Sequence, residues 1–253
     1  IGETDHKFDI GVRYHYDQIR RLQNKDTYTQ DANGYITSHT STMYGEEGNK
    51  LQYTHATSLN VSDQIKFKKL TFTPGIRAEN IDATYIKYNE DDNGDHIQKI
   101  TTHTGQNYGM IAGGASLKMG VDLLGSINRG VSPPSPSGSA KDGLREETSV
   151  GYELGMRYAD APKAFSTELI FFLTNISDLI IPDSIGGAGA GATQQAGDVR
   201  TRGVELAVNY DHGLRKGWAF QTPMYISATY TDATFTDAAV TSDAEESIWI
   251  GAK

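Results

Sequence analysis

Apolar and polar residues alternate along most of the chain. The first such segment carries apolar side chains at every second position, namely Phe8, Ile10, Val12, Tyr14 and Tyr16. The same alternation returns from Leu70 to Arg77, from Gly151 to Tyr158 and from Gly203 to Tyr210. A period of two residues is typical of β-strands, whose successive side chains point to opposite faces. Helical periodicity is nearly absent, so the sequence predicts an all-β protein.

The two faces of these strands differ in a way that favours a membrane barrel. The polar face carries charged residues and glycine in mid-strand, while the apolar face ends in tyrosine, as at Tyr16, Tyr158 and Tyr210. Outer-membrane barrels show an apolar, lipid-facing band that is bordered by aromatic residues and surrounds a polar interior. A soluble β-sandwich also alternates in this way, and a carbohydrate-binding sandwich is therefore an alternative.

The pattern predicts about ten strands joined by links that alternate between long and short. The strands are expected at 7–22, 49–61, 70–85, 106–118, 121–130, 146–158, 164–180, 198–211, 218–231 and 245–253. The longer links are 23–48, 86–105, 131–145, 181–197 and 232–244, and the shorter links are 62–69, 119–120, 159–163 and 212–217. Outer-membrane barrels have long extracellular loops and short periplasmic turns. The sequence therefore predicts an antiparallel, up-and-down transmembrane β-barrel.

Composition excludes several other classes of protein. The chain has 253 residues, of which 37% are hydrophobic, and it contains no cysteine. Such a chain is too apolar to be disordered and has neither a disulfide framework nor a Cys-ligated zinc site. A net charge of −9 argues against nucleic acid as the main partner. The longest apolar run, Leu169 to Leu173, is far too short for a transmembrane helix.

Two apparent motifs carry no chemistry, and no catalytic site is expected. The segment Asn89 to Asp95 resembles the start of a calcium loop, but Ile100 stands where a bidentate Glu is required. The run Gly187 to Ala192 lacks the strand and helix of a dinucleotide-binding unit. The seven His residues are scattered, and no Ser, His and Asp arrangement can be assembled. We therefore predict no metal, no cofactor and no enzymatic activity.

Three segments, in this order along the chain, resemble TonB-dependent outer-membrane receptors. Asn128 to Pro136 resembles the strand end and following loop of that family. Glu147 to Tyr158 is similar to its "Tyr-Glu-Leu-Gly" strand, and Ala196 to Glu205 to its later "Arg-Thr-Arg-Gly-Val-Glu" strand. The Ser-Pro-Pro-Ser-Pro form, together with the run from Lys7 to Gln23, most resembles the ferric citrate type of receptor.

The resemblance implies the fold and function of a larger protein. Family members carry a plug domain and a barrel of the 22-stranded transporter class, so residues 1–253 are expected to form part of one barrel domain, without the plug and the remaining strands. The parent would take up a ferric chelate through the bacterial outer membrane. Its implied partners are the chelate, TonB (through the plug), outer-membrane lipid and lipopolysaccharide. Another outer-membrane barrel, either an adhesin or phage receptor or a barrel enzyme, is the alternative function.

The register of the first strand indicates which residues face the lumen. If Phe8 to Tyr16 face lipid, then Arg13, His15, Asp17 and Arg21 face the lumen, and Arg20 points toward lipid headgroups. Arginine suits an anionic chelate, because its guanidinium binds carboxylates in a bidentate manner.

The candidate ligand-binding residues are Arg21, Gln23, Asn128, Arg145, Gln194 and Gln195. The alternative role for such arginines is a structural network in the lumen that holds the strands and the plug in place. That network would comprise Arg13, Arg77, Arg157, Glu79, Glu153 and Glu205.

Overall fold

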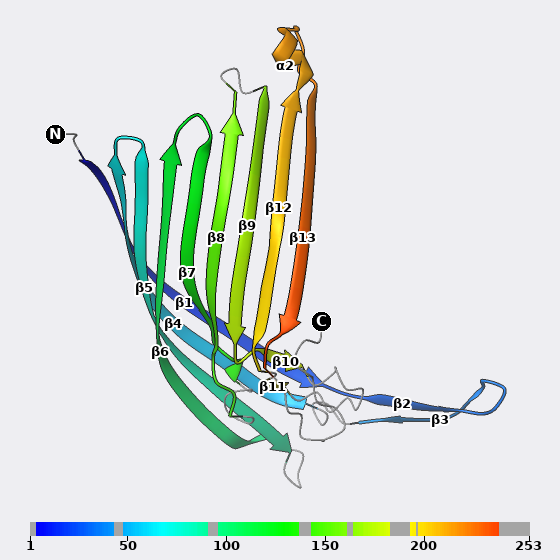
Figure 1. Ribbon diagram of the computed structural model, residues 1–253. Helices are drawn as coiled ribbons and strands as arrows, with labels where there is room; N and C mark the ends of the chain where they lie inside the picture. Colours follow the sequence, from blue (N-terminus) through cyan, green and yellow to red (C-terminus); the bar gives the residue numbers. More distant parts are fainter. Residues whose placement is uncertain are drawn as a thin grey trace.

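A computed structural model describes residues 4–42, 48–90, 96–136, 143–160, 164–182, 193–195 and 197–237. Its long strands are β1 (Thr4–Gln23), β4 (Gly48–Phe67), β5 (Leu70–Glu90), β6 (His96–Lys118), β7 (Asp122–Ser132), β8 (Glu147–Ala159), β9 (Phe165–Ser177), β12 (Val199–Asp211) and β13 (Pro223–Phe235). They form one nine-stranded sheet in the order β1-β4-β5-β6-β7-β8-β9-β12-β13. Every neighbouring pair is antiparallel. The sheet curves strongly and is open between β1 and β13 (Figure 1).

Short elements extend the links at both ends of the sheet. The strands β2 (Asp26–Gln30) and β3 (Ile36–Ser41) form a hairpin that projects beyond the sheet (Figure 1). The strands β10 (Ile180–Pro182) and β11 (Thr193–Gln195) pair with each other beside the same end. The helix α2 (His212–Lys216) lies at the opposite end, between β12 and β13. None of the described helices has the length and apolarity needed to cross a membrane.

Most of the predicted strands are confirmed, but two predicted links are wrong. The expected link 86–105 is short, because β5 continues to Glu90 and β6 begins at His96. The β-favouring residues Ile86 and Tyr88 sustain this extension. The expected short link 212–217 instead spans 212–222 and contains α2. Link lengths therefore do not alternate strictly. The tenth expected strand, 245–253, lies outside the described residues.

An apolar band runs across one face of the sheet. Its most exposed members include Ile10 at 70%, Leu154 at 66% and Ile226 at 65% of their full surface. Paired residues point to the same face of an antiparallel sheet, and the pairs Leu59 with Val12, Ile76 with Ile111, Leu154 with Phe171 and Val204 with Tyr230 extend the band from β1 to β13. Only a few apolar side chains of the described residues are buried. Apart from two short hairpins, the described residues form no second sheet, which contradicts a two-layered sandwich and suits a lipid-facing wall.

Candidate ligand-binding wall

Over the described residues, the opposite, polar face of the sheet carries three recesses at different levels. We call the end of the sheet that carries the β2–β3 hairpin the upper end and the end that carries α2 the lower end; Figure 1 draws the upper end at the bottom. A lower recess of about 360 Å³ lies near the turn between β4 and β5. A middle recess of about 250 Å³ lies over β1, β4 and β5. An upper recess of about 220 Å³ lies where β1 ends and β4 begins, beside the link that carries the β2–β3 hairpin. The polar face thus offers binding space along the length of the strands.

The upper recess is lined by a row of cations. Arg21 of β1 pairs with Lys50 of β4, and Lys50 pairs with Lys87 of β5, so the three side chains share one face in directly opposed positions. Gln23 and Tyr85 complete this part of the recess, and Arg21 donates a hydrogen bond to Oε1 of Gln23. Directly opposed like charges destabilise a sheet. The upper recess therefore concentrates positive charge at this end of the wall.

The middle recess holds charges that are largely bonded to one another. Arg13 Nη2 lies 2.7 Å from Nδ1 of His15, and His15 Nε2 lies 2.7 Å from Oδ2 of Asp17. Arg77 donates two hydrogen bonds to Oε2 of Glu79, at 3.2 and 3.3 Å. These contacts support the network role predicted as the alternative for Arg13 and Arg77. The proline segment 133–136, which follows β7, also lines this recess.

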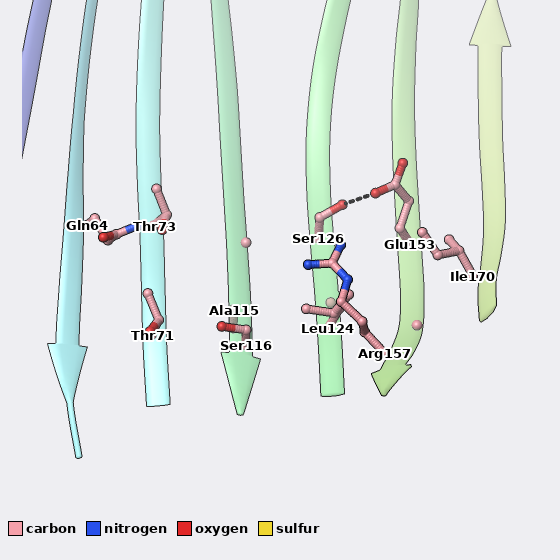
Figure 2. A pocket seen from close by; sticks show the side chains of 13 residues that line it. Gln64, Thr71, Thr73, Ala115, Ser116, Leu124, Ser126, Glu153, Arg157 and Ile170 are labelled. Carbon is pink, nitrogen blue, oxygen red and sulfur yellow. Dashed lines mark hydrogen bonds between the residues drawn. The ribbon is translucent and has the colours of Figure 1, made fainter. Parts of the chain in front are cut away.

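The lower recess is lined mainly by small and hydroxyl-bearing residues from six strands, as Figure 2 shows. Ser126 Oγ donates a hydrogen bond of 2.9 Å to Oε2 of Glu153. Arg157 is paired with Glu168 on β9. Gly114, Gly125 and Gly155 line the recess without side chains, which allows another chain segment to approach the sheet closely.

The six predicted binding residues do not form one site. Arg21 and Gln23 meet in the upper recess. Asn128 lies on β7 opposite Gly151, and its side chain covers that glycine so closely that an added Cβ would lie 2.9 Å from Oδ1. Asn128 therefore fills a gap in the wall beside Gly151, apart from the upper recess.

Arg145 and Gln195 belong to a second cluster at the same end of the sheet. Arg145 Nη2 donates to Oδ1 of Asp178 at 2.6 Å. Gln195 Nε2 donates to the carbonyl oxygens of Arg145 and Asp178, both at 3.4 Å. The backbone of Gln194 pairs with Ile181, and its side chain lies outside the described residues. Among the described residues, no hydrogen bond joins this cluster to Arg21 or Gln23.

Sequence reasoning missed Lys50, Lys87 and Tyr85 in the upper recess. The predicted strand ended at residue 85, so Lys87 was assigned to a loop, and the pairing of Arg21 with Lys50 depends on a register that no single strand reveals. The sequence signal that could have indicated this row was a lysine near the same end of each of the two strands that follow β1 in the sheet, namely Lys50 and Lys87. Arg20, by contrast, lies on the other face as predicted, where it donates to Oδ1 of Asn49 at 2.7 Å and stacks over Tyr88.

An antiparallel sheet with an apolar band on one face and a recessed polar wall on the other defines part of a transmembrane barrel. Residues 1–247 match the family model described as TonB dependent receptor-like, beta-barrel, and the chain belongs to this family. Its members are outer-membrane transporters of Gram-negative bacteria and not enzymes, in agreement with the prediction of no enzymatic activity. A search of curated proteins found no match.

Several solved receptors share the fold. The unliganded ferric citrate transporter FecA matches with a TM-score of 0.65 and 21% identity, over 92% of this chain and 33% of that protein. The ferric-catecholate import receptor Fiu from E. coli K12, in its closed form, gives 0.62 and 14%, over 92% and 36%. The copper transporter OprC gives 0.57 and 12%, over 90% and 36%. The chain spans about a third of the length of these proteins.

Proposed function

We propose that the parent protein is a TonB-dependent receptor that takes up an anionic ferric chelate, of the ferric citrate kind, across the bacterial outer membrane. The row of Arg21, Lys50 and Lys87 is the observation that carries this proposal. Three cations on one face of three adjacent strands match a ligand that presents several carboxylates. The likeness to a ferric citrate transporter in overall fold supports the same choice.

In this proposal the apolar face contacts lipid and the polar face lines the lumen. The end that carries the β2–β3 hairpin is extracellular, so an entering ligand meets the upper recess first (Figure 1). The edges of an open sheet expose backbone groups that a membrane does not tolerate. Further strands of the parent would therefore join β1 to β13, and a plug domain inside the barrel would transmit the action of TonB. The lipid-facing band would contact outer-membrane lipid and lipopolysaccharide.

The site would recognise charge and planar geometry together. The guanidinium of Arg21 can bind one carboxylate through two parallel bonds, while the two lysines act as point charges around it. A hydrogen bond to a charged group contributes roughly 1.5–3 kcal/mol. Replacing Arg21 by an uncharged residue should therefore weaken the binding of an anionic chelate about ten- to a hundredfold. Arg145, Gln194 and Gln195, which lie at the same end of the sheet, would add contacts from the neighbouring links.

Equilibrium binding of ferric citrate to the purified parent receptor tests the proposal. The variants are Arg21→Gln and Lys87→Gln, and both should bind ferric citrate more weakly while a neutral chelate is unaffected. Arg20→Gln is the matched control, because it removes the same charge from the neighbouring position on the other face. If neither Arg21→Gln nor Lys87→Gln weakens binding, or if Arg20→Gln weakens it most, the proposal of an anionic ligand is wrong. The assignment of the chain to a receptor barrel would not be affected.

A further inference from the structure

A fourth recess, of about 480 Å³, opens over β9, β12 and β13. Its apolar lining includes Phe171, Leu173, Val204 and Tyr230, which belong to the apolar band, while Phe172 and Gly203 complete it. Two arginines, Arg200 and Arg202, also line it. This recess therefore combines an apolar floor with two cations.

Both arginines are held in place by neighbouring side chains and still expose donors. Arg202 donates through Nε and Nη2 to Oδ2 of Asp232, at 3.3 and 3.2 Å, yet its side chain is 67% exposed. Arg200 donates through Nε to Oδ1 of Asn175 at 2.9 Å. A guanidinium has five N–H donors, so further donors on each remain for a ligand. Two cations beside one carboxylate leave the recess with a positive charge.

The arginines lie at the edge of the apolar band. Along this face of β12, Arg200 and Arg202 precede Val204, Leu206 and Val208, so the charge stands immediately beyond the apolar residues. Tyr230, which pairs with Val204, marks the boundary as an aromatic residue does at a membrane interface. The edge is the one nearer the long links of the sheet, which is the extracellular side in the proposed orientation.

A third arginine lies in the same row. Arg200 pairs with Asn175, Asn175 with Val150, and Val150 with Arg129, so all four share the apolar-face register. Three strand spacings separate Arg129 from Arg200, which corresponds to about 14 Å. A ligand that carries two anionic groups at such a separation could contact both ends of the row.

We infer that this recess binds a phosphorylated lipid of the outer leaflet, with a phosphate on Arg200 and Arg202 and an acyl chain against Phe171, Val204 and Tyr230. Arginine binds phosphate through short, charge-assisted and bidentate hydrogen bonds. The apolar floor favours a lipid over a soluble anion, because a free phosphate gains nothing from apolar surface. The inference rests on the proposed orientation in the membrane and is independent of which ligand the lumen takes up.

Lipid titration of the detergent-purified parent receptor, followed by native mass spectrometry, tests the inference. The probes are bisphosphorylated lipid A, the same lipid without phosphates, and inorganic phosphate. The variants are Arg200→Gln and the double variant Arg200→Gln with Arg202→Gln. Arg215→Gln is the matched control, because Arg215 is also half-exposed and paired with a carboxylate, Asp160, at the other end of the sheet.

The double variant should bind bisphosphorylated lipid A at least about tenfold more weakly, with Arg200→Gln intermediate and Arg215→Gln unchanged. Wild-type receptor should bind the phosphate-free lipid as weakly as the double variant binds the phosphorylated one. Equal binding by wild type and double variant, equal binding of both lipids, or displacement of the lipid by inorganic phosphate would each overturn the inference. The double variant should bind ferric citrate as the wild type does. The lipid measurement therefore tests this inference, and the ferric citrate measurement separately tests the proposed function.

Discussion

Phe172 and Gly203 face each other across β9 and β12, and the phenyl ring occupies the space where a side chain at residue 203 would begin. A Cβ added to Gly203 would lie 2.5 Å from Cζ of Phe172 and 2.1 Å from the carbonyl oxygen of Tyr230. Gly203 belongs to the Arg-Thr-Arg-Gly-Val-Glu segment that resembles the receptor family. A glycine is therefore required at this position of the segment, because the ring of Phe172 and the backbone of β13 leave no space for a side chain.

Gly203→Ala should destabilise the barrel. The carbonyl of Tyr230 belongs to the backbone, so the methyl group can be accommodated only by shifting β13, and overpacking of this kind costs about 1–3 kcal/mol. Gly109→Ala is the control, because an added Cβ at Gly109 meets no atom within 4 Å. Urea unfolding of the parent receptor measures both. Equal midpoints for the two variants would contradict the steric account.

A charge on the apolar band should be far more damaging than the same charge on the polar wall. Ile226 and Ser227 are adjacent on β13 and point to opposite faces, with Val208 and Ala207 as their respective partners. Ile226→Arg places a guanidinium among acyl chains, at about 2–4 kcal/mol near the bilayer midplane, whereas Ser227→Arg enters a polar lumen. Heat-modifiable gel migration measures barrel assembly. If Ser227→Arg assembles less well than Ile226→Arg, the two faces are assigned the wrong way round.

The alternation of apolar and polar residues predicted the two faces of the strands correctly, because successive side chains of any strand point to opposite faces. Arg20 and Arg21 could therefore be placed on opposite faces without a structure. The row formed with Lys50 and Lys87 could not be predicted, because it depends on how three strands pair. The pairing of Lys50 with Lys87 follows from the tight turn between β4 and β5 at Lys68, whose φ of 54° lies in the left-handed region, and β-turn geometry of this kind has no strong signal in a Lys-Lys sequence.

The helix α2 was missed for a different reason. Five residues are too few to show a helical period, and the link was expected to be a short turn. Capping residues were the available signal: Asp211 accepts a hydrogen bond from the backbone N–H of Leu214, and Gly217 adopts a left-handed φ of 67°. Asp at the N-cap and Gly after the last turn are the residues that such a helix requires.

Acid should open the α2 turn. The backbone N–H groups of Leu214 and Thr222 donate to Oδ1 of Asp211, at 2.8 and 3.0 Å, and these bonds hold the pKa of the Asp211 carboxyl below its ordinary value. Because the folded pKa is below the unfolded one, the stabilisation is complete above about pH 4 and is lost as the pH falls through the folded value. Fluorescence of Trp218, which contacts His212, reports the turn once Trp249 and any tryptophans elsewhere in the parent are replaced by Phe.

Asp211→Asn serves as the control for this acid transition. An Asn side chain can accept the same backbone hydrogen bonds but does not titrate, so the turn should stay closed as the pH falls. Asp211→Ala should leave the turn open even at neutral pH. An acid-induced change in Trp218 fluorescence that persists in Asp211→Asn would show that another group drives the transition.

The two ends of the sheet should differ in their exposure on intact cells. Tyr35 lies between β2 and β3 with 72% of its surface exposed, whereas Lys216 lies in the last turn of α2, at the opposite end (Figure 1). This chain has no cysteine, so Tyr35→Cys and Lys216→Cys each introduce one thiol here. With any cysteines elsewhere in the parent replaced, a membrane-impermeant thiol reagent should label Tyr35→Cys on intact cells.

Lys216→Cys should react only after the outer membrane is disrupted, because its end of the sheet faces the periplasm in the proposed orientation. Labelling after disruption is the internal control, since both thiols should then react to the same extent. Labelling of Lys216→Cys alone on intact cells would mean that the barrel has the opposite orientation, and equal labelling of the two variants would contradict the proposed orientation. In the opposite orientation, the row of Arg21, Lys50 and Lys87 would lie at the periplasmic end of the barrel, away from the point where an external ligand enters. The upper recess would then have to bind a ligand that arrives from the periplasm.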